Sequence, residues 1–151
     1  MSTADDQVFE RELERIGARR SLLFGLGGLL AFKLTSGMGP PTEWHEVTIA
    51  VPLDAEDARA TASRILKSMG KLITPSNGAA SDSLWAHIGA GYIDNNPTIV
   101  KVEFIGTSRK SSQVVIRGAA KEAILVKPRS AYKAVEKIRA RLLGEEVPDF
   151  S

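Results

Sequence analysis

The chain contains no cysteine among its 151 residues, and this absence excludes several kinds of chemistry. Disulfide bonds, a thiolate nucleophile and thiolate metal sites all require that residue. Aromatic residues make up only 6% of the chain, which argues against a surface that stacks nucleic-acid bases. The common metalloprotease, nucleophile-elbow, phosphate-loop and calcium-loop motifs are also missing from the sequence. We therefore expect a protein that is not an enzyme and that uses no cofactor and no metal.

The composition fits one globular domain with an appendage, at 43% hydrophobic and 25% charged residues. The net charge of +2 hides a strong asymmetry along the chain. Residues 43–100 hold seven acidic and four basic side chains, for a net charge of −3. Residues 101–143 hold eleven basic and three acidic side chains, for a net charge of +8. This basic half predicts a surface that faces an anionic partner.

Residues 1–20 are predicted to form a polar helical arm. Apolar side chains recur there at spacings of three and four residues, at Val8 or Phe9, Leu13 and Ile16. The resulting apolar stripe is narrow, so we expect a helix that is mostly solvated.

Residues 21–38 form an apolar segment in which positions 21–32 carry no charge. Twelve helical residues span only about 18 Å, but a helix that continued to Met38 would be long enough to cross a bilayer. Three interpretations fit. The segment could be an export signal, because residues 18–23 resemble a twin-arginine signal, with Arg19 and Arg20 directly before the apolar run. It could be an uncleaved membrane anchor, or a buried helix or oligomer contact.

Of these interpretations we favour contact with a membrane, which makes a membrane the expected partner. The side chains expected to touch lipid are Leu22, Leu23, Phe24, Leu26, Leu29, Leu30 and Phe32. Four arginines precede the apolar run and only Lys33 follows it closely. If the segment spans the bilayer, the positive-inside rule places the folded domain outside the cytoplasm.

A linker at residues 39–45 precedes an α+β domain at residues 46–144, and an acidic tail follows at 145–151. Residues 46–53 alternate as a strand with one buried face, Asp54 is suited to cap a helix, and Gly70 is suited to end it. Three more alternating runs predict strands near residues 84–90, 99–105 and 113–119, and a last helix runs from Pro128 to Leu143. The expected fold is a two-layer β-α-β-β-β-α domain. Its sheet has four mostly antiparallel strands, with both helices on one face.

Histidines and carboxylates give few candidate sites. His45 lies at the exit of the linker, and His87 is expected on the sheet face that the helices leave bare. Neither has an acidic partner that the sequence can identify. Glu103 and Arg117 are predicted to pair across neighbouring strands.

A basic stripe on the last helix is the strongest candidate site. Arg129, Lys133, Lys137 and Arg141 recur at steps of four and share one helix face. With two bases from the turn at 106–112, the predicted anion-binding residues are Arg109, Lys110, Arg129, Lys133, Lys137 and Arg141. Phosphates of lipid headgroups or of nucleic acid would suit them, but no aromatic residue is interleaved, so we do not expect nucleic acid. The alternative interpretation is an ordinary solvated helix face.

These features predict a non-catalytic, membrane-tethered envelope domain that binds a protein, a lipid or a small ligand. The alternative is a soluble intracellular protein that binds nucleic acid or takes part in assembly, with an apolar N-terminal segment that mediates oligomerisation. An enzyme would need a deep polar pocket that holds His87 and an acid.

Overall fold

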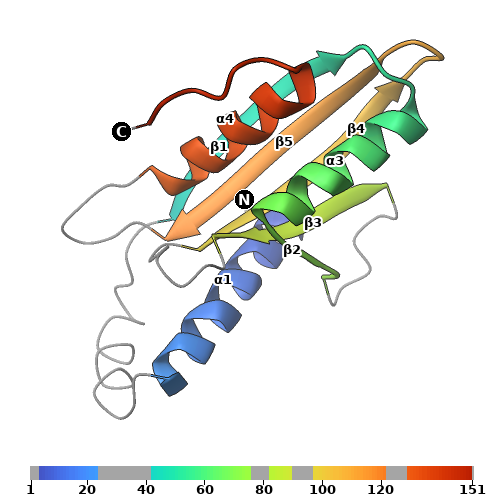
Figure 1. The fold of residues 1–151 in the computed structure, drawn as a ribbon. Coiled ribbons are helices and arrows are strands. Elements are labelled where there is room, and N and C mark those ends of the chain that lie inside the picture. Colours follow the sequence, from blue (N-terminus) through green and yellow to red (C-terminus); the bar gives the residue numbers. More distant parts are fainter. Residues whose placement is uncertain (1–3, 24–41, 76–81, 90–96, 122–128, 151) are drawn as a thin grey trace.

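The computed structural model describes residues 4–23, 42–75, 82–89, 97–121 and 129–150 of the chain (Figure 1). In these residues the chain forms three helices and five strands, so the predicted α+β class is confirmed. The elements follow in the order α1 Ala4–Leu23, β1 Thr42–Val51, α3 Ala55–Met69, β2 Gly70–Ile73, β3 Ser83–Ile88, β4 Thr98–Thr107, β5 Ser112–Lys121 and α4 Ser130–Leu143.

The strands form one antiparallel sheet in the order β1-β5-β4-β3-β2. The sheet has five strands where four were predicted, because strand β2 is only four residues long and follows helix α3 without a loop. Gly70 ends α3 as expected, and it is also the first residue of β2. A Cβ atom at that position would collide with the backbone carbonyl of His87, so the tight junction requires glycine.

Helices α3 and α4 pack on one face of the sheet, as predicted. Asp54 caps α3 by accepting a 2.8 Å hydrogen bond from the backbone N–H of Asp57. The core between these helices and the strands is built mainly from aliphatic side chains. Its largest fully buried members are Val51, Leu66, Val100, Val102, Val114, Ile116, Val135 and Ile138.

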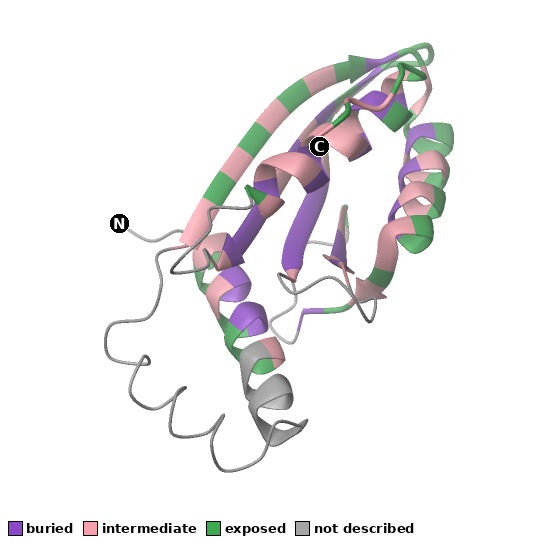
Figure 2. Cartoon of the chain, turned by 60° about the vertical axis from the view of Figure 1, so that its left-hand side comes forward, coloured by how far each residue is buried: buried purple, intermediate pink, exposed green. Residues whose placement is uncertain are grey.

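Helix α1 packs on the opposite face of the sheet, where the prediction of a mostly solvated arm is wrong. Phe9 is fully buried and Leu13 nearly so, and both join a second apolar cluster with Trp85 and Ile99. Along their strands, Trp85 and Ile99 are direct neighbours of Ala86 and Val100, which belong to the first core. Because successive residues of a strand point to opposite faces, Trp85 and Ile99 lie on the face of the sheet away from that core. In Figure 2 the buried residues of α1 are drawn in purple, next to its exposed residues in green. The domain therefore has helices on both faces of the sheet.

Helix α4 begins without a side-chain cap from Arg129, the residue directly before it. Arg129 takes a left-handed backbone conformation, with φ of 51°, and its side chain makes no capping hydrogen bond. Instead, the carboxylate of Glu43 in β1 accepts hydrogen bonds from the backbone N–H groups of Ala131 and Tyr132, at 3.2 and 3.4 Å. The helix ends at Leu143 as predicted, and Gly144 follows it in a left-handed conformation. Strand β1 thus holds the start of the helix that carries the basic stripe.

Candidate functional site: a basic cleft between two helices

A cavity of about 440 Å³ lies where α4, the end of α3 and the adjoining ends of β3 and β4 meet. We call it the basic cleft. It is lined by Ser68, Met69, Ile88, Gly89, Thr98, Ser130, Lys133, Ala134, Lys137 and Arg141. Three of these residues are cations and none is an acid, so the electrostatic potential inside the cleft favours an anion. Its volume falls within the roughly 300–1,000 Å³ that is typical of small-molecule sites.

The three cations come from consecutive turns of one face of α4. Lys133, Lys137 and Arg141 are spaced by four residues, which places them above one another along the helix. Arg141 reaches the other wall, where its Nη1 atom donates a 3.0 Å hydrogen bond to the hydroxyl of Ser68 in α3. Phe150 of the C-terminal tail lies beside the middle cation, with its ring 5.9 Å from the Nζ atom of Lys137.

The remaining lining residues give the cleft a mixed character. Met69, Ile88 and Ala134 supply apolar surface, while Thr98 and Ser130 supply hydroxyl groups. Thr98 is almost fully buried, so it lies on the floor of the cleft. The arrangement suits a ligand that combines an anionic group with an apolar part.

The structure brings together only half of the six predicted anion-binding residues. Arg129 lies over the ring of Tyr132, at 4.2 Å, and does not line the cleft. Arg109 and Lys110 are exposed in the turn after Thr107, whereas the cleft adjoins Thr98 at the other end of β4. The sequence could not show the second wall, Ser68 and Met69, because α3 reaches the cleft only through the tertiary fold.

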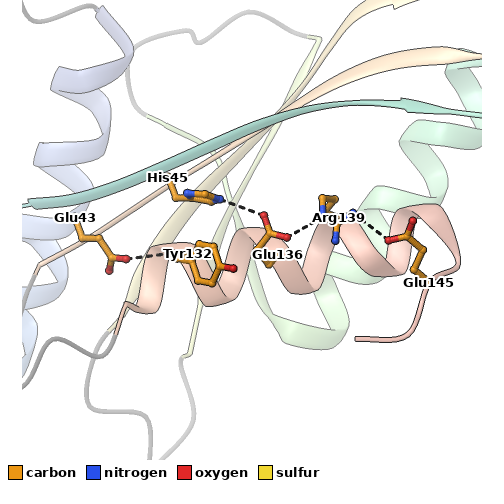
Figure 3. Close-up of polar contacts among 6 residues, drawn as sticks. All are labelled: Glu43, His45, Tyr132, Glu136, Arg139 and Glu145. Carbon is orange, nitrogen blue, oxygen red and sulfur yellow. Dashed lines mark hydrogen bonds and ion pairs between the residues drawn. The ribbon is translucent and has the colours of Figure 1, made fainter. Parts of the chain in front are cut away.

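A partly exposed polar network connects α4 to β1 (Figure 3). His45 Nε2 lies 3.2 Å from Glu136 Oε1, and Arg139 Nε donates to Glu136 Oε2 at 2.8 Å. Arg139 also binds Glu145 at 3.0 Å. Burial raises the pKa of Glu136, but the hydrogen bonds from Arg139 and His45 outweigh it and leave that pKa lowered. The hydrogen bond to Glu136 raises the pKa of Arg139.

This network supplies the acidic partner that the sequence could not assign to His45. Glu136 is 91 positions away from His45, and only the packing of α4 against β1 brings the two together. Tyr132 completes the cluster with an edge contact to the ring of His45, at 4.8 Å between centroids. The contacts hold helix and strand in a fixed relation, so their role is to position α4.

A smaller cavity of about 180 Å³ lies between α1 and the sheet. It is lined by Glu12, Arg15, Ile16, Lys71, Ile73, His87 and Ile99. His87 therefore lies under a helix and not on a bare sheet face, which corrects the expectation. The cavity does combine His87 with an acid, but it is smaller than typical ligand sites, and the carboxylate of Glu12 already pairs with Arg15 at 3.8 Å. Among the residues that the structure describes, no three histidines or carboxylates are grouped to hold a metal ion.

The predicted pair between Glu103 and Arg117 is wrong, because the register of β4 and β5 places Lys101 opposite Arg117. Glu103 accepts a hydrogen bond from Lys101 of its own strand at 2.8 Å. Arg117 pairs instead with Asp6 of α1, at 2.7 Å.

The predicted lipid-contacting side chains lie outside the described part of the structure. Leu22 and Leu23 belong to α1 by their backbone, and Phe24, Leu26, Leu29, Leu30 and Phe32 follow after its end. None of the helices in the described residues combines the length and apolar character that crossing a membrane requires.

Comparisons with other proteins add little to this description. No protein-family model matches the chain, and no curated protein matches it. One solved structure with some likeness is a point mutant of norcoclaurine synthase from Thalictrum flavum, in complex with a transition-state analogue. The likeness covers 71% of this chain and 98% of that one, at 13% sequence identity and a TM-score of 0.31. A likeness of this degree bears on neither the fold nor the function of this chain.

Proposed function

We propose that this chain is a non-catalytic binding domain, held at a membrane by its apolar segment, whose basic cleft binds an anionic ligand with an apolar part. The observation that carries the proposal is the convergence of Lys133, Lys137 and Arg141 on a cavity of about 440 Å³, with no acid among its described lining residues. Three cations at close range repel one another, and an anionic ligand would relieve that repulsion.

Two further features support a small ligand in preference to a nucleic acid. The cations face a concave cleft, whereas nucleic-acid surfaces usually spread their bases and interleave aromatic side chains. The hydrogen bond from Arg141 to Ser68 also joins the two walls of the cleft. Phosphate esters of lipids combine the required charge with an apolar chain, and a membrane would supply them.

Attachment to a membrane is supported by the sequence of residues 21–32, which carry no charge and hold eight leucine, phenylalanine or alanine side chains. Flotation of the full chain with vesicles of phosphatidylcholine and phosphatidylglycerol in equal parts tests this half of the proposal. Protein that stays at the bottom of the gradient would refute the attachment.

Ligand binding is tested by titrating the full chain with dihexanoyl phosphatidic acid below its micellar concentration. We expect the double variant Lys133→Gln, Lys137→Gln to bind at least about tenfold more weakly, because each lost contact to a charged group costs on the order of 1.5–3 kcal/mol. The matched control is Arg109→Gln, Lys110→Gln, which removes the same charge from the distant turn. Equal losses in both variants would show a nonspecific charge effect, and no measurable binding by the unaltered chain would refute the proposed ligand.

A further inference from the structure

Helix α1 is an integral part of the folded domain. Its side chain Phe9 is fully buried between the chain's two tryptophans, with ring centroids 5.2 Å from Trp44 in β1 and 4.8 Å from Trp85 in β3. Leu13 extends the same contact one turn further along the helix. Burial of a phenylalanine and a leucine is a large favourable contribution to the stability of a small domain.

Three ion pairs reinforce the apolar contact between α1 and the sheet. Each joins an acid in the first two turns of α1 to a base on β4 or β5. The pairs are Asp5 with Lys101 at 2.6 Å, Asp6 with Arg117 at 2.7 Å and Glu10 with Lys121 at 2.7 Å. These strand positions all lie on the face opposite α3 and α4. The helix and the sheet therefore match in charge as well as in apolar surface.

The partly buried members of these pairs are held in their charged forms. Burial lowers the pKa of Lys101, but hydrogen bonds to Asp5 and Glu103 outweigh it and leave that pKa raised. Burial raises the pKa of Glu10, but hydrogen bonds from Lys121 and Thr42 outweigh this effect and leave that pKa lowered. Lys101 and Glu10 are thus held in their charged forms at neutral pH.

The packing of α1 on the sheet limits the ways in which the chain can attach to a membrane. The part of helix α1 that packs on the sheet precedes the apolar segment at 21–38 in the chain, and β1 follows that segment. A segment that crosses a bilayer once leaves its two flanks on opposite sides. Phe9 cannot be buried between Trp44 and Trp85 if a bilayer separates the two flanks.

We infer that the chain attaches to its membrane from one side only, with α1 and the five-stranded sheet in the same compartment. This inference rests on the proposed membrane attachment and replaces the orientation that the arginine count suggests. It also requires that α1 stays in the mature protein, because removing it would expose Trp85 and Ile99, which are now 2% and 0% exposed.

The absence of cysteine makes the inference directly testable. Single cysteines are introduced at two exposed positions of the full chain, Gln7→Cys on α1 and Ala50→Cys on β1. Cells that produce each variant are converted to sealed, oriented membrane vesicles and treated with a membrane-impermeant maleimide, before and after detergent. We expect the two cysteines to behave alike, either both labelled or both protected until detergent is added.

Each other result has a definite meaning. Labelling of one cysteine and protection of the other would overturn the inference and leave the membrane attachment standing. A mature chain that has lost residues 4–16, seen by intact mass, would overturn it as well. Failure to float with vesicles would overturn both proposals, so this measurement comes first. The double variant Gln7→Cys, Ala50→Cys, labelled at both sites or at neither, gives an internal check within one molecule.

Discussion

The ring of Phe9 in helix α1 lies 4.8 Å from the ring of Trp85 in strand β3, and this contact links the N-terminal helix to the second face of the sheet. Trp44 contacts the same phenylalanine from β1, and the guanidinium of Arg117 lies 5.6 Å from its ring. Three strands of the sheet thus contribute to the site that receives one side chain. The domain is consequently built from three layers, with α1 on one side and α3 and α4 on the other.

We predict that Phe9→Ala lowers the free energy of unfolding by about 3–5 kcal/mol, because it removes a fully buried ring and leaves a cavity beside the buried ring of Trp85. Urea unfolding followed by tryptophan fluorescence measures this directly, since both tryptophans of the chain contact Phe9. The control is Gln7→Ala at an exposed position of the same helix, which should change stability by no more than about 0.5 kcal/mol. A Phe9→Ala variant as stable as this control would contradict the docking of α1.

The start of helix α4 depends on Glu43, since Arg129 offers no side-chain cap. We expect Glu43→Ala to cost about 1 kcal/mol, because two backbone N–H groups lose their acceptor and the positive end of the helix dipole loses a nearby carboxylate. Glu43→Gln keeps an oxygen acceptor and should cost less. Thermal unfolding measures both, with Thr48→Ala at an exposed position of β1 as the control. Equal stability of the Glu43→Ala variant and this control would show that water caps the helix equally well.

Gly118 in β5 allows α4 to approach the sheet closely. A Cβ atom there would lie 2.8 Å from Val135 Cγ2 and 3.3 Å from the backbone carbonyl oxygen of Ala131. We predict that Gly118→Ala destabilises the domain by about 1–3 kcal/mol through overpacking. Combining it with Val135→Ala should cost less than the two single changes together, because the second change removes the nearer obstacle. Strict additivity in a double-mutant cycle of urea unfolding would contradict this close contact.

Local sequence signals predicted much of the first core. The alternation at residues 46–53, the cap at Asp54 and the end of the last helix at Leu143 could be predicted, because each depends on near neighbours in the chain. Strand β2 was missed, since four residues are too few to establish a period of two.

The packing of α1 was missed for a different reason. Its apolar stripe is narrow, and the acids that complete the interface find their bases on β4 and β5, in a register that the sequence does not fix. The same uncertainty in register made the Glu103 and Arg117 pair wrong. For the candidate site, the spacing of four predicted that Lys133, Lys137 and Arg141 share a face, but only the tertiary fold shows that α3 turns this face into a cleft.

The pairing of Glu136 with His45 and Arg139 predicts a loss of stability in acid. The pKa of Glu136 is lowered in the folded protein, while in the unfolded chain it should lie near the usual value of about 4.3. Above that value both states are ionised, and the network contributes its full stabilisation. As the pH falls below it, the unfolded chain takes up the proton first, so stability is lost until the folded pKa is passed.

We therefore expect Glu136→Gln to be less stable than the unaltered chain at pH 7 and to lose less stability between about pH 5 and pH 3. Glu10, whose pKa is lowered as well, should preserve part of the acid dependence in this variant. Urea unfolding at a series of pH values measures both effects, with Glu146→Gln at an exposed position as the matched control. If Glu136→Gln and Glu146→Gln lost stability in parallel as the pH fell, the carboxylate of Glu136 would not be stabilised by its neighbours, and the polar network would not fasten α4 to β1.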